Sequence, residues 1–369
     1  MSRVVIPALL IIGLSAASTS LALSADSAER APRPADRMVN LGFEDIVNND
    51  PGHLPELARR LDSVDATAVS ISVGRTDWTA FPSSSGSAAS TTPESTGRDF
   101  VAEAIAAVGT SGNGVKRDII LTIDVLLDRT LRDDPSLAGR DIAGKASGSF
   151  ASVSALRNGK AGSRLVAMAS EVAERYHPLA VDVTELMFDD FVFGADDLKD
   201  FKATTGLEDW PRLGNGSIDA SDPHLRTWRC EAVADIARQV SAAVEPFGVR
   251  TEMDVRSPKT SASADRADSG HDYDLLLKQV SRLHVWQYVG LNDERAPETE
   301  ALVRALDERA GSRISMSLGL WANDGTISAK TFGDALKEAA KGGATSISVT
   351  PASLMSDDHW EVLRKAWAG

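Results

Sequence analysis

The sequence is poor in cysteine and in positive charge, and both shortages limit what the protein can be. Cys230 is the only cysteine among 369 residues, so no disulfide can form within the chain and the fold must depend on its hydrophobic core. The chain has 39 Lys and Arg residues against 53 Asp and Glu residues, which gives a formal net charge of -14. Nucleic acids and anionic membranes are bound through an excess of Lys and Arg, so neither is expected as the main partner. A neutral or cationic ligand fits this charge better.

Long apolar runs are also missing, except at the N-terminus. Arg3 precedes an apolar stretch over residues 4–17, and mostly small residues follow at 22–25. This order is typical of a secretory signal peptide, and the apolar stretch is too short for an ordinary membrane span. We therefore expect a signal peptide over residues 1–24 and a disordered leader over 25–37. The mature protein is expected to be secreted, extracellular and monomeric, without stable membrane insertion.

Beyond residue 37, eight short runs of apolar or β-branched residues alternate with longer amphipathic stretches. The runs cover residues 38–47, 68–74, 118–127, 180–190, 250–255, 282–289, 313–321 and 345–350. Such alternation predicts parallel strands joined by helical crossovers, and eight units favour a single α/β domain, a (β/α)8 TIM barrel over residues 38–369. No Gly-rich turn follows the first run, where a nucleotide-binding sheet would need one. We expect no cofactor.

The connections between these elements are unequal in length. Helix-to-strand connections are short, whereas the strand-to-helix connections at residues 83–98, 132–162, 207–223 and 257–272 are long and irregular. In a barrel, all strand-to-helix loops lie at the C-terminal face, where active sites are found. Long loops on that face are expected to form the walls of a groove.

Acidic and aromatic residues gather at the predicted strand ends. The candidate catalytic residues are Glu185, Asp189, Asp190 and Asp254, and the candidate substrate-binding residues are Asp45, Arg75, Trp78, Asp124, Arg256, Trp286, Tyr288, Trp321 and Asn323. The flat apolar face of a tryptophan suits a sugar ring, although these tryptophans could also fill the top of the barrel. Likewise, Asp190 could be an ordinary loop residue. A carbohydrate polymer is the expected substrate.

The fourth run carries the most informative acids. If residues 180–190 form one strand, alternation puts Glu185 and Asp189 on one face and Asp190 on the other. A carboxyl group beside other carboxylates has a raised pKa and can donate a proton. A second acid, from Asp254 or Asp124 on a neighbouring strand, would complete the two-carboxylate arrangement of glycoside hydrolysis.

Residues 177–206, HPLAVDVTELMFDDFVFGADDLKDFKATTG, resemble part of the secreted bacterial glycosidase-like barrels. That group includes the poly-N-acetylglucosamine hydrolases, which share a strand of the type apolar-Phe-x-Asp-Asp ahead of an acidic helix. The resemblance implies a barrel that cleaves a cell-wall, capsule or biofilm polysaccharide, with catalysis by Asp189 or Asp190. The motif here is FDDF, and the chitinase-like pattern of four alternating acids is not reproduced.

Two other functions fit parts of the pattern. A metal-dependent barrel hydrolase would need a His, Asp and Glu cluster, but the six histidines are scattered without a His-x-His pair. We therefore expect no metal site, although Glu44, Asp45 and Asp124 keep this alternative open. A non-catalytic polysaccharide-binding barrel would keep the tryptophans without paired acids. A serine esterase is disfavoured because no Gly-x-Ser-x-Gly motif occurs.

Overall fold

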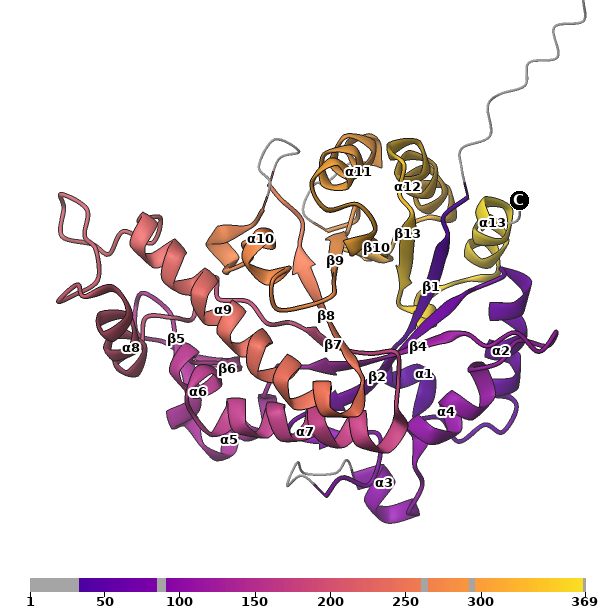
Figure 1. The fold of residues 1–369 in the computed structure, drawn as a ribbon, viewed down its shortest axis with the longest axis horizontal. Helices are drawn as coiled ribbons and strands as arrows, with labels where there is room; N and C mark the ends of the chain where they lie inside the picture. Colours follow the sequence, from indigo (N-terminus) through magenta and orange to yellow (C-terminus); the bar gives the residue numbers. More distant parts are fainter. Residues whose placement is uncertain (1–32, 85–90, 260–264, 292–295, 368–369) are drawn as a thin grey trace, which may run out of the picture. The chain divides into compact units, whose positions relative to one another are not determined.

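Parallel strands close into a barrel at the centre of the computed structural model, which describes residues 33–84, 91–259, 265–291 and 296–367 (Figure 1). Within these residues the central sheet has nine strands, and the pairing of β1 with both β13 and β2 closes it. Its parallel strands are β1 (Asp36–Leu41), β2 (Ala68–Arg75), β4 (Asp118–Asp124), β7 (Ala180–Thr184), β8 (Arg250–Arg256), β9 (Arg282–Gln287), β10 (Ile314–Gly319) and β13 (Ser346–Thr350). The predicted (β/α)8 barrel is therefore confirmed. The predicted signal peptide, and the leader up to residue 32, lie outside the described residues.

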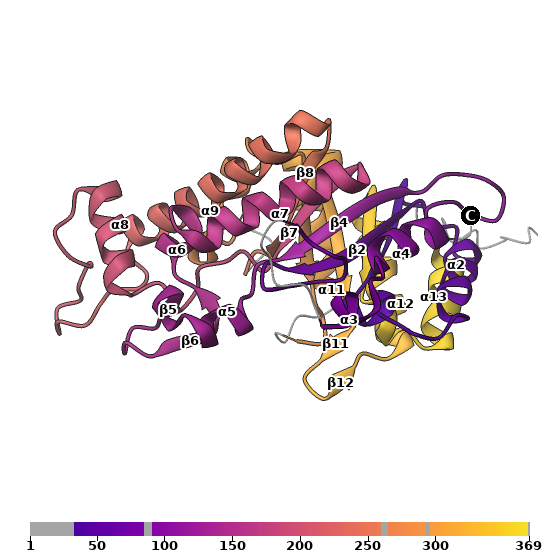
Figure 2. The same cartoon turned by 90° about the horizontal axis from the view of Figure 1, so that it is seen from below.

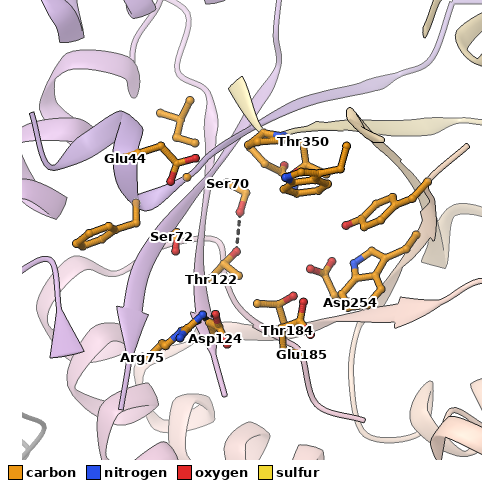
Figure 3. A pocket seen from close by; sticks show the side chains of 18 of the residues that line it. Glu44, Ser70, Ser72, Arg75, Thr122, Asp124, Thr184, Glu185, Asp254 and Thr350 are labelled. Carbon is orange, nitrogen blue, oxygen red and sulfur yellow. Dashed lines mark hydrogen bonds and ion pairs between the residues drawn. The ribbon is translucent and has the colours of Figure 1, made fainter. Parts of the chain in front are cut away.

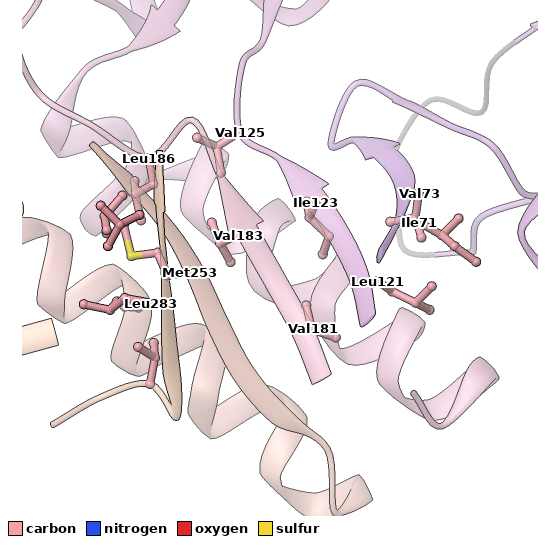
Figure 4. Close-up of a cluster of buried hydrophobic side chains, with 14 of the residues drawn as sticks. Ile71, Val73, Leu121, Ile123, Val125, Val181, Val183, Leu186, Met253 and Leu283 are labelled. Atoms are coloured by element: carbon pink, nitrogen blue, oxygen red, sulfur yellow. The ribbon is translucent and has the colours of Figure 1, made fainter. Parts of the chain in front are cut away.

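Helices surround the barrel and cover the outward faces of its strands. They are α2 (His53–Ser63), α4 (Phe100–Val108), α7 (Lys160–Tyr176), α9 (Pro223–Val244), α10 (Tyr273–Leu276), α11 (Ala296–Ala310), α12 (Ala329–Gly342) and α13 (Asp357–Trp367). The outward strand residues are apolar and pack beneath these helices; Val181, Val183 and Met253 are examples (Figure 4). Among the described helices, none combines the length and the hydropathy that a membrane span requires.

The inside of the barrel is apolar only at its N-terminal end. There Met38, Ala68, Ile120 and Ala180 form a small buried cluster. Towards the C-terminal end the inward positions become polar, as in the hydrogen bond of 2.6 Å between the hydroxyls of Ser70 and Thr122. Because strand side chains alternate with a period of two, each strand carries an apolar outer face and a polar inner face.

Two strands, β1 and β7, end six residues before their predicted ends. β1 ends at Leu41, and Asp45 lies in the short helix α1 (Phe43–Ile46). β7 ends at Thr184, because Glu185 has φ of 62°, a left-handed conformation that breaks the extended chain. The predicted strand over residues 180–190, with Glu185 and Asp189 on one face, is therefore wrong.

The long connections after β4 and β7 build a lobe beside the barrel (Figures 1 and 2). It contains α5 (Asp128–Asp133), β5 (Ala138–Arg140), β6 (Ala146–Ala151), α6 (Val153–Arg157) and α8 (Ala195–Thr205). An aromatic cluster of Phe193, Phe201, Trp210 and Trp228 holds α8 against α9. Other strand-to-helix connections carry β3 (Trp78–Thr79), α3 (Thr91–Thr96), β11 (Trp321–Ala322) and β12 (Gly325–Thr326).

Candidate active site

A cavity of about 580 Å³ opens at the C-terminal ends of the barrel strands. Its lining includes eight of the residues predicted from the sequence: Arg75, Trp78, Asp124, Glu185, Asp254, Trp286, Tyr288 and Trp321. Figure 3 shows that Asp124, Glu185 and Asp254 lie along one side of it, at the ends of β4, β7 and β8. The barrel thus brings together acids that are far apart in the sequence.

The other predicted residues lie elsewhere. The Asp45 carboxylate accepts a hydrogen bond from the Gly42 N–H at 2.8 Å, which caps α1, and burial raises the pKa of Asp45 to about 6. Asn323 is exposed in the turn between β11 and β12. Asp189, Asp190 and Arg256 line a separate, smaller depression of about 90 Å³.

Glu185 is an acid of the cavity that is partly protonated at neutral pH. Its left-handed backbone turns the chain out of β7, and its carboxyl group lies in the cavity. Burial is the main cause that raises its pKa to about 7, and the nearby carboxylates of Asp124 and Asp254 add to the effect. A non-glycine residue with positive φ is uncommon and often marks a functional position.

Asp124 forms an ion pair with Arg75. The Arg75 Nε donates to Asp124 Oδ2 at 2.8 Å, Arg75 Nη1 donates to Asp128 at 2.7 Å, and the Leu126 N–H donates to Asp124 Oδ1. Arg75 is positioned by a tight turn in which β3 folds back onto the end of β2. The turn requires Gly74, which has φ of 123° and where a Cβ would lie 2.5 Å from the Trp78 carbonyl oxygen.

A buried network of ionisable groups lies beneath Asp254. Side chains from three adjacent strands meet there: Asp182 on β7, Glu252 and Asp254 on β8, and His284 on β9. His284 Nε2 lies 2.9 Å from Glu252 Oε2. Burial lowers the pKa of His284, but Glu252, Asp182 and Asp254 together outweigh it and raise the pKa to about 9. His284 is therefore a cation at neutral pH.

This network has three acids and one base, and burial opposes the ionisation of its acids. Burial, and then the charge of Asp254, raises the pKa of Asp182 well above its usual value. Burial also raises the pKa of Asp254, while His284 opposes the shift. No role was predicted from the sequence for Asp182 or His284. The pattern that could have indicated them is a polar residue between two apolar ones, Val181 and Val183 in β7 and Leu283 and Val285 in β9.

An aromatic wall lines the cavity on the side of Asp254. The rings of Trp286 and Tyr288 are stacked with centroids 5.5 Å apart, and Tyr288 and Trp321 follow at 5.3 Å. Gly319 leaves the space for Tyr288, because a Cβ at that position would lie 2.3 Å from the tyrosine ring. Such a wall offers an apolar face to a ligand whose polar groups meet the acids of the same cavity.

Across the described ranges, no three His, Cys, Asp or Glu side chains are arranged to hold a metal ion. Of the acids considered for such a site, Asp45 caps α1 and Asp124 pairs with Arg75.

Comparison with known proteins supports the fold. No protein-family model matches the sequence, and neither does any curated protein. Among solved structures, the glycoside hydrolase domain of PgaB (BpsB) from Bordetella bronchiseptica has a TM-score of 0.70 at 13% identity, covering 90% of this chain and 99% of that one. The catalytic domain of β-amylase from Paenibacillus polymyxa has a TM-score of 0.62 at 11% identity, covering 91% and 98%. At these identities the likeness is one of fold.

Proposed function

We propose that this chain is a secreted glycoside hydrolase that cleaves a cell-wall, capsule or biofilm polysaccharide. The observation that carries the proposal is Glu185, a carboxyl group with a pKa near 7 in a cavity that also holds Asp254 and an aromatic wall. The solved structures that share the fold, PgaB and β-amylase, bear names of enzymes that act on glycosidic bonds, which is consistent with it.

Glu185 is the proton donor in this proposal. In its protonated form it would transfer a proton to the glycosidic oxygen, so that the sugar leaves as an alcohol while positive charge develops at the anomeric carbon. A pKa near the working pH suits this role, because the group is then protonated often enough to donate and acidic enough to do so.

Asp254 is the second carboxylate. It lies on β8, the strand that pairs with β7, and lines the same cavity as Glu185. Within the described residues it forms no ion pair with Arg or Lys, whereas the Asp124 carboxylate is occupied by Arg75 and the Leu126 N–H. Asp254 would act on the anomeric carbon or on a water beside it, the two arrangements known for paired carboxylates. Asp124 and Arg75 would then bind substrate hydroxyl groups.

The aromatic wall supplies binding rather than chemistry. Trp286, Tyr288 and Trp321 would stack against sugar rings and exclude water from the reacting bond. Burial raises the pKa of Tyr288, and the nearby acids raise it further, so its hydroxyl group stays protonated and can donate a hydrogen bond.

A polysaccharide panel tests this proposal. The purified chain is incubated with bacterial cell-wall, capsule and biofilm polysaccharides, and new reducing ends are measured. We expect release from at least one of them, and a fall of about 10² to 10⁴ for Glu185→Gln. Glu308→Gln is the matched control, because Glu308 is exposed on α11. Binding of a polysaccharide without cleavage would instead identify a non-catalytic binding protein. Cleavage that persists in Glu185→Gln would remove Glu185 from the mechanism.

A further inference from the structure

The smaller depression beside the cavity has the composition of a carbohydrate-binding site. It is lined by Phe150 on β6, by Met187 to Phe191 in the loop after β7, and by Arg256 at the end of β8. The Phe150 and Phe191 rings are stacked, with centroids 5.9 Å apart and an interplanar angle of 10°, and both are only half-buried.

An ion pair lies in the same depression as the Phe150 and Phe191 rings. Arg256 Nη2 and Asp189 Oδ2 are 2.9 Å apart, and their side chains keep exposed fractions of 32% and 27%. Asp190 beside them is exposed. A guanidinium and a carboxylate side by side offer donors and acceptors to vicinal hydroxyl groups, while an aromatic ring offers a surface to the C–H face of a sugar.

The depression is held in a fixed position. The Phe188 N–H donates to the Ser269 carbonyl oxygen at 3.0 Å. His271 is buried, and burial lowers its pKa to about 4, so its ring is neutral. It accepts from the Arg256 N–H through Nδ1 and donates to the Leu186 carbonyl oxygen through Nε2. A neutral imidazole with one donor and one acceptor therefore ties the loop after β7 to the end of β8.

The loop after β7 and strand β8 also contribute residues to the lining of the cavity. The loop after β7 gives Glu185 to the cavity and Asp189 to the depression, and β8 gives Asp254 to the cavity and Arg256 to the depression. The two hollows therefore lie next to each other at the C-terminal face. A linear glycan with one residue at Glu185 could continue directly into the depression.

We propose that this depression is an accessory subsite that binds a further sugar unit of the same polysaccharide chain. The inference rests on the proposed function and narrows it: the substrate is a polymer or long oligosaccharide that contacts the protein in both the cavity and the depression. Asp189 and Asp190 thus bind substrate, in place of the catalytic role predicted from the sequence.

Chain length is the variable that tests the subsite. The polysaccharide of the panel that is cleaved fastest, or bound most tightly if none is cleaved, is partially hydrolysed with acid and separated by size. Where it is cleaved, kcat/KM is measured for each length. For the wild type we expect a step in kcat/KM between short and long chains. Phe191→Ala and Asp189→Asn should lower the ratio of long-chain to short-chain kcat/KM by about tenfold or more, since remote binding energy is used in the transition state.

Controls separate this result from a folding defect and from failure of the proposed function. Leu213→Ala, at an exposed apolar residue of the same lobe, should leave the ratio unchanged. Equal losses on short and long chains, or an unchanged ratio, would refute the subsite while leaving glycoside hydrolysis standing. Binding of the same length series to Glu185→Gln is measured in parallel by calorimetry. If affinity does not depend on chain length and Phe191, the subsite is refuted, whether or not any glycan is cleaved.

Discussion

Replacing Glu185 by glutamine tests the origin of its acidity as well as its role. The pKa of Glu185 is raised from 4.5 to about 7 in the folded protein, mainly by burial. The unfolded chain therefore gives up this proton more readily than the folded one. Below pH 4.5 the group is protonated in both states and has no effect on stability. As the pH rises from 4.5 to 7, its ionisation favours the unfolded state.

The size of this effect follows from the shift. A difference of about 2.5 pKa units corresponds to about 3 kcal/mol. Glutamine has nearly the same shape and cannot ionise, so the Glu185→Gln variant does not lose this unfolding free energy as the pH rises. Compared with the wild type, the variant should gain about 3 kcal/mol of unfolding free energy between pH 4.5 and pH 8. If Glu185 is the proton donor that we propose, this loss of stability is an example of function and folding in competition.

Urea unfolding, followed by tryptophan fluorescence at pH 4.5 and pH 8, measures this difference. Glu308→Gln, at an exposed position, should change stability by less than about 0.5 kcal/mol at both pH values. The rate supplies a second readout, because kcat/KM of the wild type should fall about tenfold per pH unit above about pH 7. A stability difference between Glu185→Gln and the wild type that stays constant with pH would refute the raised pKa and with it the reasoning for a proton donor.

Three further substitutions test other parts of the site. Glu252→Gln leaves the cationic His284 buried without its partner and should cost about 3 to 5 kcal/mol in urea unfolding at pH 7; a loss below about 1 kcal/mol would contradict the ion pair. Gly319→Ala places a methyl group against Tyr288 and should cost about 1 to 3 kcal/mol and weaken glycan binding by calorimetry, whereas unchanged binding would show that the ring has room to move. Trp321→Ala should raise KM more than it lowers kcat, and the opposite pattern would place this ring at the reacting bond.

Local patterns were sufficient to predict the architecture. Residues 68–74, 118–127 and 250–255 alternate apolar and polar side chains or form short apolar runs, and each contains or overlaps a barrel strand, β2, β4 or β8. Such periodicities depend only on neighbours in the sequence and on one buried face. The ends of the strands then indicated eight residues that line the cavity, because all parallel strands of a barrel end on the same face.

The end of β7 was less predictable. An apolar run continues through Leu186, Met187 and Phe188, so the sequence suggests a strand up to Asp190. The left-handed backbone of Glu185 ends strand β7 earlier, at Thr184. Hydrogen bonds to distant segments, such as the one from the Phe188 N–H to the Ser269 carbonyl oxygen, then fix the conformation of the loop that follows. One residue thereby decides that Glu185 lies in the cavity and Asp189 outside it.

The sequence by itself determined the barrel and eight of the residues that line its cavity, because strand and helix periodicity are local properties. Only the tertiary structure decided which acids share an environment. Asp182, Asp254 and His284 come from three strands, and their pKa values are set by burial and by register between those strands. The raised pKa of Glu185 has the same origin, since desolvation and the fields of Asp124 and Asp254 exist only once the barrel has closed.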